Sequence, residues 1–208
     1  ASIWQEGCRP YYREAKAMKI IAITTPKVTD EDAYIIASLL DLGVDIVHLR
    51  KTESSVDECR KLLEALSEEH RRRIVVHDYP VLYDEFSLRG IHINRRVTEL
   101  PEVYDGLRTR SCHSLEEVVR YKRDYDYLFL SPIFDSISKV GYRSGFDEGE
   151  LQRLSKEGVI DDRVIALGGV TFDKIAYLKS LHFGGVAMLG ALYSVEAVDN
   201  LDDINRYR

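Results

Sequence analysis

A hydroxyl-rich loop that ends in a lysine follows one of the most apolar runs of the sequence. The loop extends from Ser131 to Lys139, contains Ser136 and Ser138, and comes directly after the run Tyr127–Leu130. Hydroxyl groups and an ammonium suit a phosphate or a pyrophosphate, because highly charged oxygens accept several short hydrogen bonds at once. A solvated surface loop is the alternative interpretation. With the residues described next, the loop predicts an anion site at the end of a buried strand.

Basic and imidazole side chains end the second apolar run. The segment reads Val47-His48-Leu49-Arg50, and alternation along a strand places His48 and Arg50 on one face. If the two apolar residues face helices, His48 and Arg50 point inward, where a guanidinium is costly unless it meets an anion. Pairing with Asp78, which follows His77 at the end of the third run, is the alternative for Arg50.

His113 is the sharpest candidate for a general base. It stands where the run Ser111-Cys112 passes into a helix that Ser114 caps, with Glu117 placed to complete a capping box. The positive end of that helix disfavours an imidazolium and favours a neutral, proton-accepting ring. A packed or surface histidine is the alternative.

Glycines follow the last two apolar runs, in the segments 166–171 and 184–190. Glycine lets backbone N–H groups approach a phosphate closely, and Gly168, Gly169 and Gly190 stand at these ends. Close packing of strand on helix is the alternative. Glycines follow both of the last two predicted strands, where TIM barrels commonly bind phosphate, and this favours phosphate binding.

The elements that must position these residues alternate between short apolar runs and amphipathic stretches, the pattern of βαβ units. Eight strands are predicted: Ile20–Thr24, Asp45–Arg50, Ile74–Asp78, Gly90–Ile93, Thr109–Cys112, Tyr127–Ser131, Val164–Gly168 and Gly185–Leu189. Helices are predicted over Asp30–Leu42, Val56–His70, Leu115–Arg123, Asp147–Lys156, Phe172–Leu181 and from Val195. The segment Val97–Leu107 contains Pro101 and Gly106 and predicts at most one helical turn. The count favours a single-domain α/β fold, the (β/α)₈ TIM barrel, over an open doubly wound sheet.

Composition narrows the class of protein. The chain has 208 residues with a formal net charge of −6, which suits one domain and a small ligand and argues against a general nucleic-acid binder. Three cysteines without metal-like spacing fit a reducing cytoplasm, and no apolar run is long enough for a membrane span. Residues 1–17 are expected to be an extension before Met18, and 18–208 the barrel.

From Met18 to about Val198 the sequence resembles the thiamine phosphate synthase family and its relative, the thiazole tautomerase. The landmarks are His48-Leu49-Arg50, His77-Asp78, Gly90-Ile91-His92-Ile93, Ser111-Cys112-His113-Ser114, the segment from Ser131 to Lys139, Ala166-Leu167-Gly168-Gly169 and Val186-Ala187-Met188-Leu189-Gly190. The resemblance implies an enzyme that couples hydroxymethylpyrimidine pyrophosphate to thiazole phosphate and releases pyrophosphate.

The resemblance also implies a role for individual residues. Arg50 and Lys139 hold the pyrophosphate, and Asp78 binds Mg²⁺. The pyrimidine side of the site contains Ser111, with His48 and His77 at family positions that usually carry Gln and Asn. The thiazole phosphate contacts Ser136 and Ser138 and the backbone of Gly168, Gly169, Leu189 and Gly190.

Two departures from the family pattern bear on the chemistry. Thr52 stands where the family usually has a lysine, and the second Mg²⁺-binding aspartate expected after the fourth strand is missing from His92-Ile93-Asn94-Arg95-Arg96. A Mg²⁺ cofactor is therefore expected to have Asp78 as its one carboxylate ligand, with substrate oxygens and waters as the remaining ligands.

Two other functions stay open at this point. A thiazole tautomerase would use His113 to move a proton without a metal, and a barrel without catalysis would only bind thiazole phosphate. A different phosphate-binding barrel isomerase is a more distant alternative. Family members often associate, but no stretch of the sequence identifies an interface for a homo-oligomer.

Overall fold

The computed structural model describes residues 17–135, 145–201 and 204–207. Eight parallel strands form a closed barrel in chain order, with β8 pairing back onto β1. The strands are β1 Lys19–Ile23, β2 Ile46–Leu49, β3 Ile74–Val76, β4 Gly90–Ile93, β5 Leu107–Cys112, β6 Tyr127–Leu130, β7 Val164–Leu167 and β8 Gly185–Met188. All eight predicted strands and the TIM-barrel fold are confirmed, with boundaries that differ by at most two residues.

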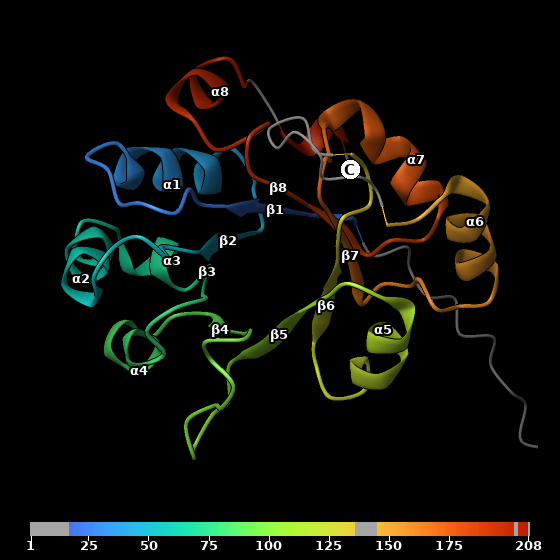
Figure 1. Ribbon diagram of the computed structural model, residues 1–208. Helices are drawn as coiled ribbons and strands as arrows, with labels where there is room; N and C mark the ends of the chain where they lie inside the picture. Colours follow the sequence, from blue (N-terminus) through green and yellow to red (C-terminus); the bar gives the residue numbers. More distant parts are fainter. Residues whose placement is uncertain (1–16, 136–144, 202–203, 208) are drawn as a thin grey trace, which may run out of the picture.

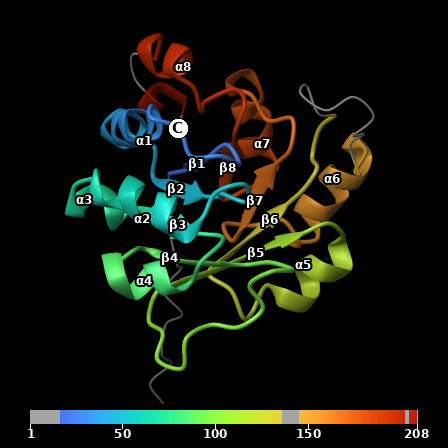
Figure 2. The same ribbon diagram turned by 60° about the vertical axis from the view of Figure 1, so that its left-hand side comes forward.

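Helices lie around the outside of the strands (Figure 1). They are α1 Asp32–Asp41, α2 Val56–Glu64, α3 Glu68–Arg71, α4 Val81–Phe86, α5 Leu115–Tyr121, α6 Glu148–Lys156, α7 Ile175–Ser180 and α8 Val195–Asp199, with 3₁₀ turns at Phe172–Lys174 and Ile204–Tyr207. The connection from β4 to β5 is a long loop without a helix, as predicted (Figure 2).

Two helix predictions need correction. The single helix predicted over Val56–His70 is two helices, because the Ser67 hydroxyl accepts a hydrogen bond from the backbone N–H of His70 and starts α3. Helix α4 was not predicted. It is short and begins directly after Pro80, a residue whose fixed φ suits a helix start.

Two apolar layers fill the fold. Inside the barrel, the strands contribute a small core built from Ile21, Ile23, Ile46, Val75, Tyr127, Phe129, Ile165 and Ala187. A larger core between strands and helices contains Val47 and Leu49 from β2. The predicted alternation along β2 is therefore confirmed, since His48 lies on the inner face between two residues that face the helices.

A buried ion pair fastens the loops after β1, β2 and β8 to one another. The Lys51 ammonium lies 2.6 Å from an Asp32 carboxylate oxygen, and both side chains are almost fully buried. Lys51 also donates to the carbonyl oxygen of Lys27 (2.9 Å), and the Tyr193 hydroxyl donates to Asp32 (2.5 Å). Burial lowers the pKa of Lys51, and the Asp32 carboxylate partly offsets that effect. These contacts hold the carboxyl ends of three strands in a fixed relation.

We expect the Asp32→Asn variant to lose about 3–5 kcal/mol of unfolding free energy, because it leaves the Lys51 ammonium buried without a counter-charge. Urea unfolding followed by circular dichroism measures this loss. Asp41→Asn is the matched control. Asp41 is an exposed helical carboxylate bound to His70, and its change should cost less than about 0.5 kcal/mol. Equal, small losses in both variants would show that the buried pair does not hold these loops.

Candidate active site

A polar pocket of about 630 Å³ opens at the carboxyl ends of β2 to β6. Its floor includes Ile23 and Phe129 from the barrel interior, and its walls include Arg50, Ser111 and His113. This is the end of a TIM barrel at which catalytic groups gather. A second hollow, of about 600 Å³, lies at the opposite end among mixed charges and contains none of the predicted site residues.

Four arginines line the pocket: Arg50, Arg95, Arg96 and Arg110. Glu117 is the one carboxylate among the described lining residues. A concave surface with this charge favours a phosphorylated or pyrophosphorylated ligand, because guanidinium groups bind such oxygens in pairs. Of the residues for which the sequence predicted an anion contact, Arg50 belongs to this cationic rim.

Asp78 is engaged by an arginine that the sequence did not assign to it. Its Oδ1 atom accepts a hydrogen bond from Arg96 Nε (2.9 Å), and its Oδ2 atom accepts one from the backbone N–H of Lys51 (3.2 Å). The alternative pairing of Asp78 with Arg50 is therefore wrong in this structure. The Arg50 side chain instead lines the pocket, where its guanidinium is available to a ligand.

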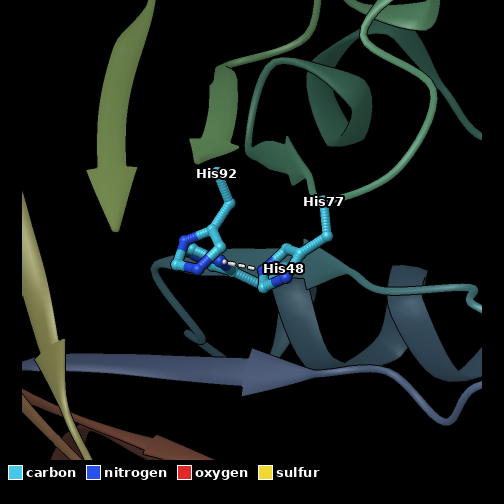
Figure 3. A group of neighbouring side chains, drawn as sticks. All are labelled: His48, His77 and His92. Carbon is cyan, nitrogen blue, oxygen red and sulfur yellow. Dashed lines mark hydrogen bonds between the residues drawn. The ribbon is translucent and has the colours of Figure 1, made fainter. Parts of the chain in front are cut away.

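Three histidines from neighbouring strands meet in the upper layer of the barrel (Figure 3). His48 Nδ1 lies 2.7 Å from His77 Nε2, and the rings of His77 and His92 stack with centroids 4.0 Å apart. The other His48 nitrogen, Nε2, lies 2.6 Å from the Tyr127 hydroxyl. The Phe129 ring packs against His48 from below, with centroids 4.7 Å apart. We call His48, His77 and His92 the histidine cluster.

Burial sets the charge of the histidine cluster. It lowers the pKa of His48 and His77 well below the usual range, and the neighbouring His92 lowers both further. Burial also lowers the pKa of His92 to about 3, with Arg110 and Arg50 adding to the effect. The three imidazoles are therefore neutral at physiological pH. His77 and His92 present neutral rings to the pocket, His48 lies buried behind them, and the arginines supply the positive charge.

His113 lies exposed on the pocket wall, at the start of α5 as predicted. Its Nδ1 atom is 3.0 Å from the carbonyl oxygen of Ser131, so in the neutral ring Nδ1 carries the proton and Nε2 carries the lone pair. The Ser114 cap on the N–H of Glu117 is confirmed. The Glu117 carboxylate instead accepts from the N–H of His113 (2.6 Å), so the second half of the predicted capping box is wrong.

Ser111 and His92 are hydrogen-bonded to each other at the pocket edge, with Oγ and Nε2 3.0 Å apart. The Thr109 hydroxyl lies 2.8 Å from the other ring nitrogen of His92. Thr109 and Ser111 thus both project inward from β5. This arrangement places Ser111 beside the neutral histidine cluster.

The glycines after β7 lie against the loop that follows β6. Gly168 and Gly169 have φ angles of +92° and +62°, and a Cβ on Gly169 would come within 2.4 Å of the Asp135 carbonyl oxygen. Close backbone packing therefore explains these two glycines, as the alternative interpretation held. At Gly190, after β8, a Cβ would meet no atom of the described residues within 4 Å. The backbone there, next to Leu189, is open to a ligand.

Three predicted residues, Ser136, Ser138 and Lys139, lie outside the described residues. Sequence reasoning gave no role to Arg110. It offered Arg95 or Arg96 as a charge that offsets pyrophosphate, and it did not predict that Arg96 pairs with Asp78. It also overlooked Lys174, whose ammonium donates to the Gly169 carbonyl oxygen (2.6 Å). A basic residue just past a strand end was the available signal for Arg96, whereas Arg110 lies within β5 and Lys174 lies in the 3₁₀ turn before α7.

Comparison with known proteins assigns the family. A family model described as thiamine monophosphate synthase matches residues 20–192. A thiamine-phosphate synthase of Lactococcus lactis subsp. lactis is 25% identical over 191 residues, which cover 85% of this chain and 87% of that protein. A thiamine-phosphate synthase of Bacteroides thetaiotaomicron is 24% identical over 182 residues, covering 81% and 87%.

Solved structures agree with this assignment. The crystal structure of a thiamine phosphate pyrophosphorylase from Bacteroides thetaiotaomicron superposes with a TM-score of 0.80 at 38% identity and covers 88% of this chain and 93% of that one. A thiamine phosphate pyrophosphorylase from Pyrococcus furiosus, at 17% identity and a TM-score of 0.72, supports the fold alone. The residues matched by the family model include the carboxyl ends of all eight strands. The chain belongs to the thiamine monophosphate synthase family.

Proposed function

We propose that this chain is a transferase of thiamine biosynthesis that joins hydroxymethylpyrimidine pyrophosphate to thiazole phosphate. The ring nitrogen of the thiazole forms a bond to the pyrimidine methylene carbon. The bond from that carbon to the pyrophosphate oxygen breaks, and pyrophosphate leaves with the electron pair. The observation that carries the proposal is the family match over residues 20–192, a region that contains the whole arginine-lined pocket.

The arginines of the pocket carry positive charge that can stabilise the pyrophosphate as it leaves. Negative charge develops on the bridging oxygen as the carbon–oxygen bond breaks, and a fixed guanidinium stabilises that charge more than it stabilises the ground state. Arg50, which lines the pocket just after β2, is proposed for this role, and Arg95 lines the same pocket. Lys139 is proposed as a second pyrophosphate contact on the resemblance alone.

Neutral groups of the cluster suit the pyrimidine. Its ring nitrogens and amino group need hydrogen-bond acceptors and donors without charge, which His77 and Ser111 would supply from the pocket lining. The predicted direct contact of His48 needs correction, because His48 is buried and both of its ring nitrogens are bonded to His77 and Tyr127. The thiazole phosphate is assigned to the opposite side of the barrel mouth. There the backbone of Gly168, Gly169, Leu189 and Gly190 would approach it, with Ser136 and Ser138 as hydroxyl contacts by resemblance.

Mg²⁺, which the family resemblance implies, does not fit the described residues as they stand. A hard dication needs several oxygen ligands, and Asp78 is the single carboxylate at the expected place. Both of its oxygens accept hydrogen bonds, one of them from the Arg96 guanidinium. The loop after β4, at Asn94–Arg96, brings positive charge where the family expects a second carboxylate. The Arg96 guanidinium thus supplies, beside Asp78, the positive charge that a metal cation would supply there.

A thiazole tautomerase is the alternative function, and in it His113 would act as the base. The tautomer that Ser131 selects leaves the Nε2 lone pair as a base, and this reaction needs no metal. The proton would leave a carbon of the thiazole carboxylate phosphate, rest on Nε2 and return at another position of the same substrate. The arginine rim would then hold the substrate's carboxylate or phosphate.

The assay that separates these functions supplies both substrates of the coupling reaction and follows thiamine phosphate by chromatography, with and without Mg²⁺. The proposed function predicts product and pyrophosphate in equal amounts. The Arg96 pairing predicts that a chelator lowers the rate by less than about tenfold. No product under either condition would reject the synthase and leave the tautomerase or a barrel that only binds thiazole phosphate, which calorimetry would detect.

Arg50→Ala is expected to lower kcat/KM of the coupling reaction by about 100-fold or more, because it removes a charged donor from the leaving group. Steady-state kinetics of pyrophosphate release measure the change. Arg153→Ala is the matched control, since Arg153 is exposed on α6, paired with Glu157 and absent from the pocket lining. Similar kinetics for the two variants would remove Arg50 from the reaction.

The tautomerase candidate has its own variant pair. His113→Ala and His113→Asn both remove the base, while the asparagine amide keeps a donor toward Ser131. Under this candidate, both variants lose conversion of the thiazole carboxylate phosphate, and a chelator has no effect on the parent enzyme. Conversion that survives in both variants would exclude His113 as the base.

A further inference from the structure

We propose that His48, His77 and His92 form a binding site for a first-row transition metal ion of the Zn²⁺ class, with one coordination position open to the pocket. The three side chains come from the neighbouring strand ends of β2, β3 and β4 and converge inside the barrel (Figure 3). The site differs from the Mg²⁺ position at Asp78 in ligand type, because it offers imidazole nitrogens and no carboxylate.

The distances suit one small ion. A ligand nitrogen from each histidine lies within 4.8 Å of the other two, and His48 Nδ1 and His77 Nε2 are 2.7 Å apart. Zinc–nitrogen bonds of about 2.0–2.1 Å in a tetrahedral site place two such nitrogens about 3.3 Å apart. Small ring rotations would therefore bring all three nitrogens to bonding distance. The stacked His77 and His92 rings would have to splay apart slightly, and Ser111 would release His92 Nε2.

Hydroxyl groups hold the outward sides of two of the rings. The Tyr127 hydroxyl lies 2.6 Å from His48 Nε2, and the Thr109 hydroxyl lies 2.8 Å from His92 Nδ1. If these nitrogens donate to the hydroxyl oxygens, the lone pairs of His48 Nδ1 and His92 Nε2 both point into the cluster. Partners of this kind orient metal-binding histidines in known sites and fix their tautomers.

The surroundings select the type of ion and its fourth ligand. Three neutral imidazoles suit Zn²⁺, Co²⁺ or Ni²⁺ and are poor ligands for Mg²⁺, which prefers oxygen. His48 is fully buried, whereas His77 and His92 reach the pocket wall, so a fourth ligand can enter from the pocket only. The arginine rim repels a bare dication, and an anion is therefore the expected fourth ligand.

Metal loading does not depend on the proposed function. Binding of the ion is measured by a spectrum and by stoichiometry, whereas the synthase is measured by its product, so either can fail while the other holds.

The test uses the full chain, stripped with a chelator and titrated with Co²⁺. The proposal predicts one equivalent bound with a dissociation constant of about 1 µM or tighter, with the visible bands of Co²⁺ in a site of low coordination number. Zn²⁺ should displace the Co²⁺ and remove the bands. Binding of less than about 0.1 equivalent at that affinity, or Co²⁺ with only its six-coordinate aqueous spectrum, would overturn the proposal.

Variants locate the ion. His77→Asn and His48→Gln, which introduce the residues usual in the family, should each weaken Co²⁺ binding by about 100-fold or more, and Tyr127→Phe by about tenfold. His182→Asn is the control, because His182 is exposed, bonded to Ser155 and far from the cluster in the fold, at the loop before β8. Circular dichroism confirms that each variant is folded. Unchanged Co²⁺ binding in His77→Asn and His48→Gln would show that the ion binds elsewhere.

Discussion

Closure of the eight-stranded barrel is the constraint on which the rest of the structure depends. Once β8 pairs with β1, every strand has one face that must be accommodated inside a narrow ring. The lower part of that interior is filled by apolar residues such as Ile21, Val75 and Ile165. Its upper part is filled by His48, His77 and His92. Inward polar groups are tolerated there because they hydrogen-bond to one another and to Tyr127, Thr109 and Ser111.

The barrel thereby places uncharged polar side chains and charged side chains at different positions. Inward positions at the strand ends carry neutral imidazoles, which burial keeps uncharged. Positions one to three residues past the ends of β2 and β4, in the loops, carry the guanidinium groups of Arg50, Arg95 and Arg96, which water still reaches. A pyrophosphate ester has the same division, with an aromatic ring at one end and several negative oxygens at the other. The pocket matches both ends of such a ligand.

The ion pair between Asp78 and Arg96 modifies this arrangement at the place where the family expects a metal. It neutralises the carboxylate from within the chain, and it leaves Arg50 without an acidic partner among the described residues. An unpaired guanidinium in a pocket is costly without a ligand and favourable with an anionic one.

Much of this could be predicted from the sequence, because strand periodicity and strand-end position are local properties. The inward placement of His48 followed from Val47 and Leu49 alone, and the position of His113 followed from the Ser114 cap. The partner of Asp78 could not be predicted, since it depends on how the helix-free loop after β4 folds back over β3. The meeting of Tyr127 with His48 depends on the stagger of strands across the barrel, which no single segment contains.

A structure of this chain with inorganic pyrophosphate bound tests the central claim most directly. The account predicts that the pyrophosphate oxygens contact the Arg50 guanidinium at the carboxyl end of β2, within the arginine-lined pocket. Pyrophosphate bound only in the hollow at the amino-terminal end of the barrel, or absent from the pocket at saturating concentration, would contradict it.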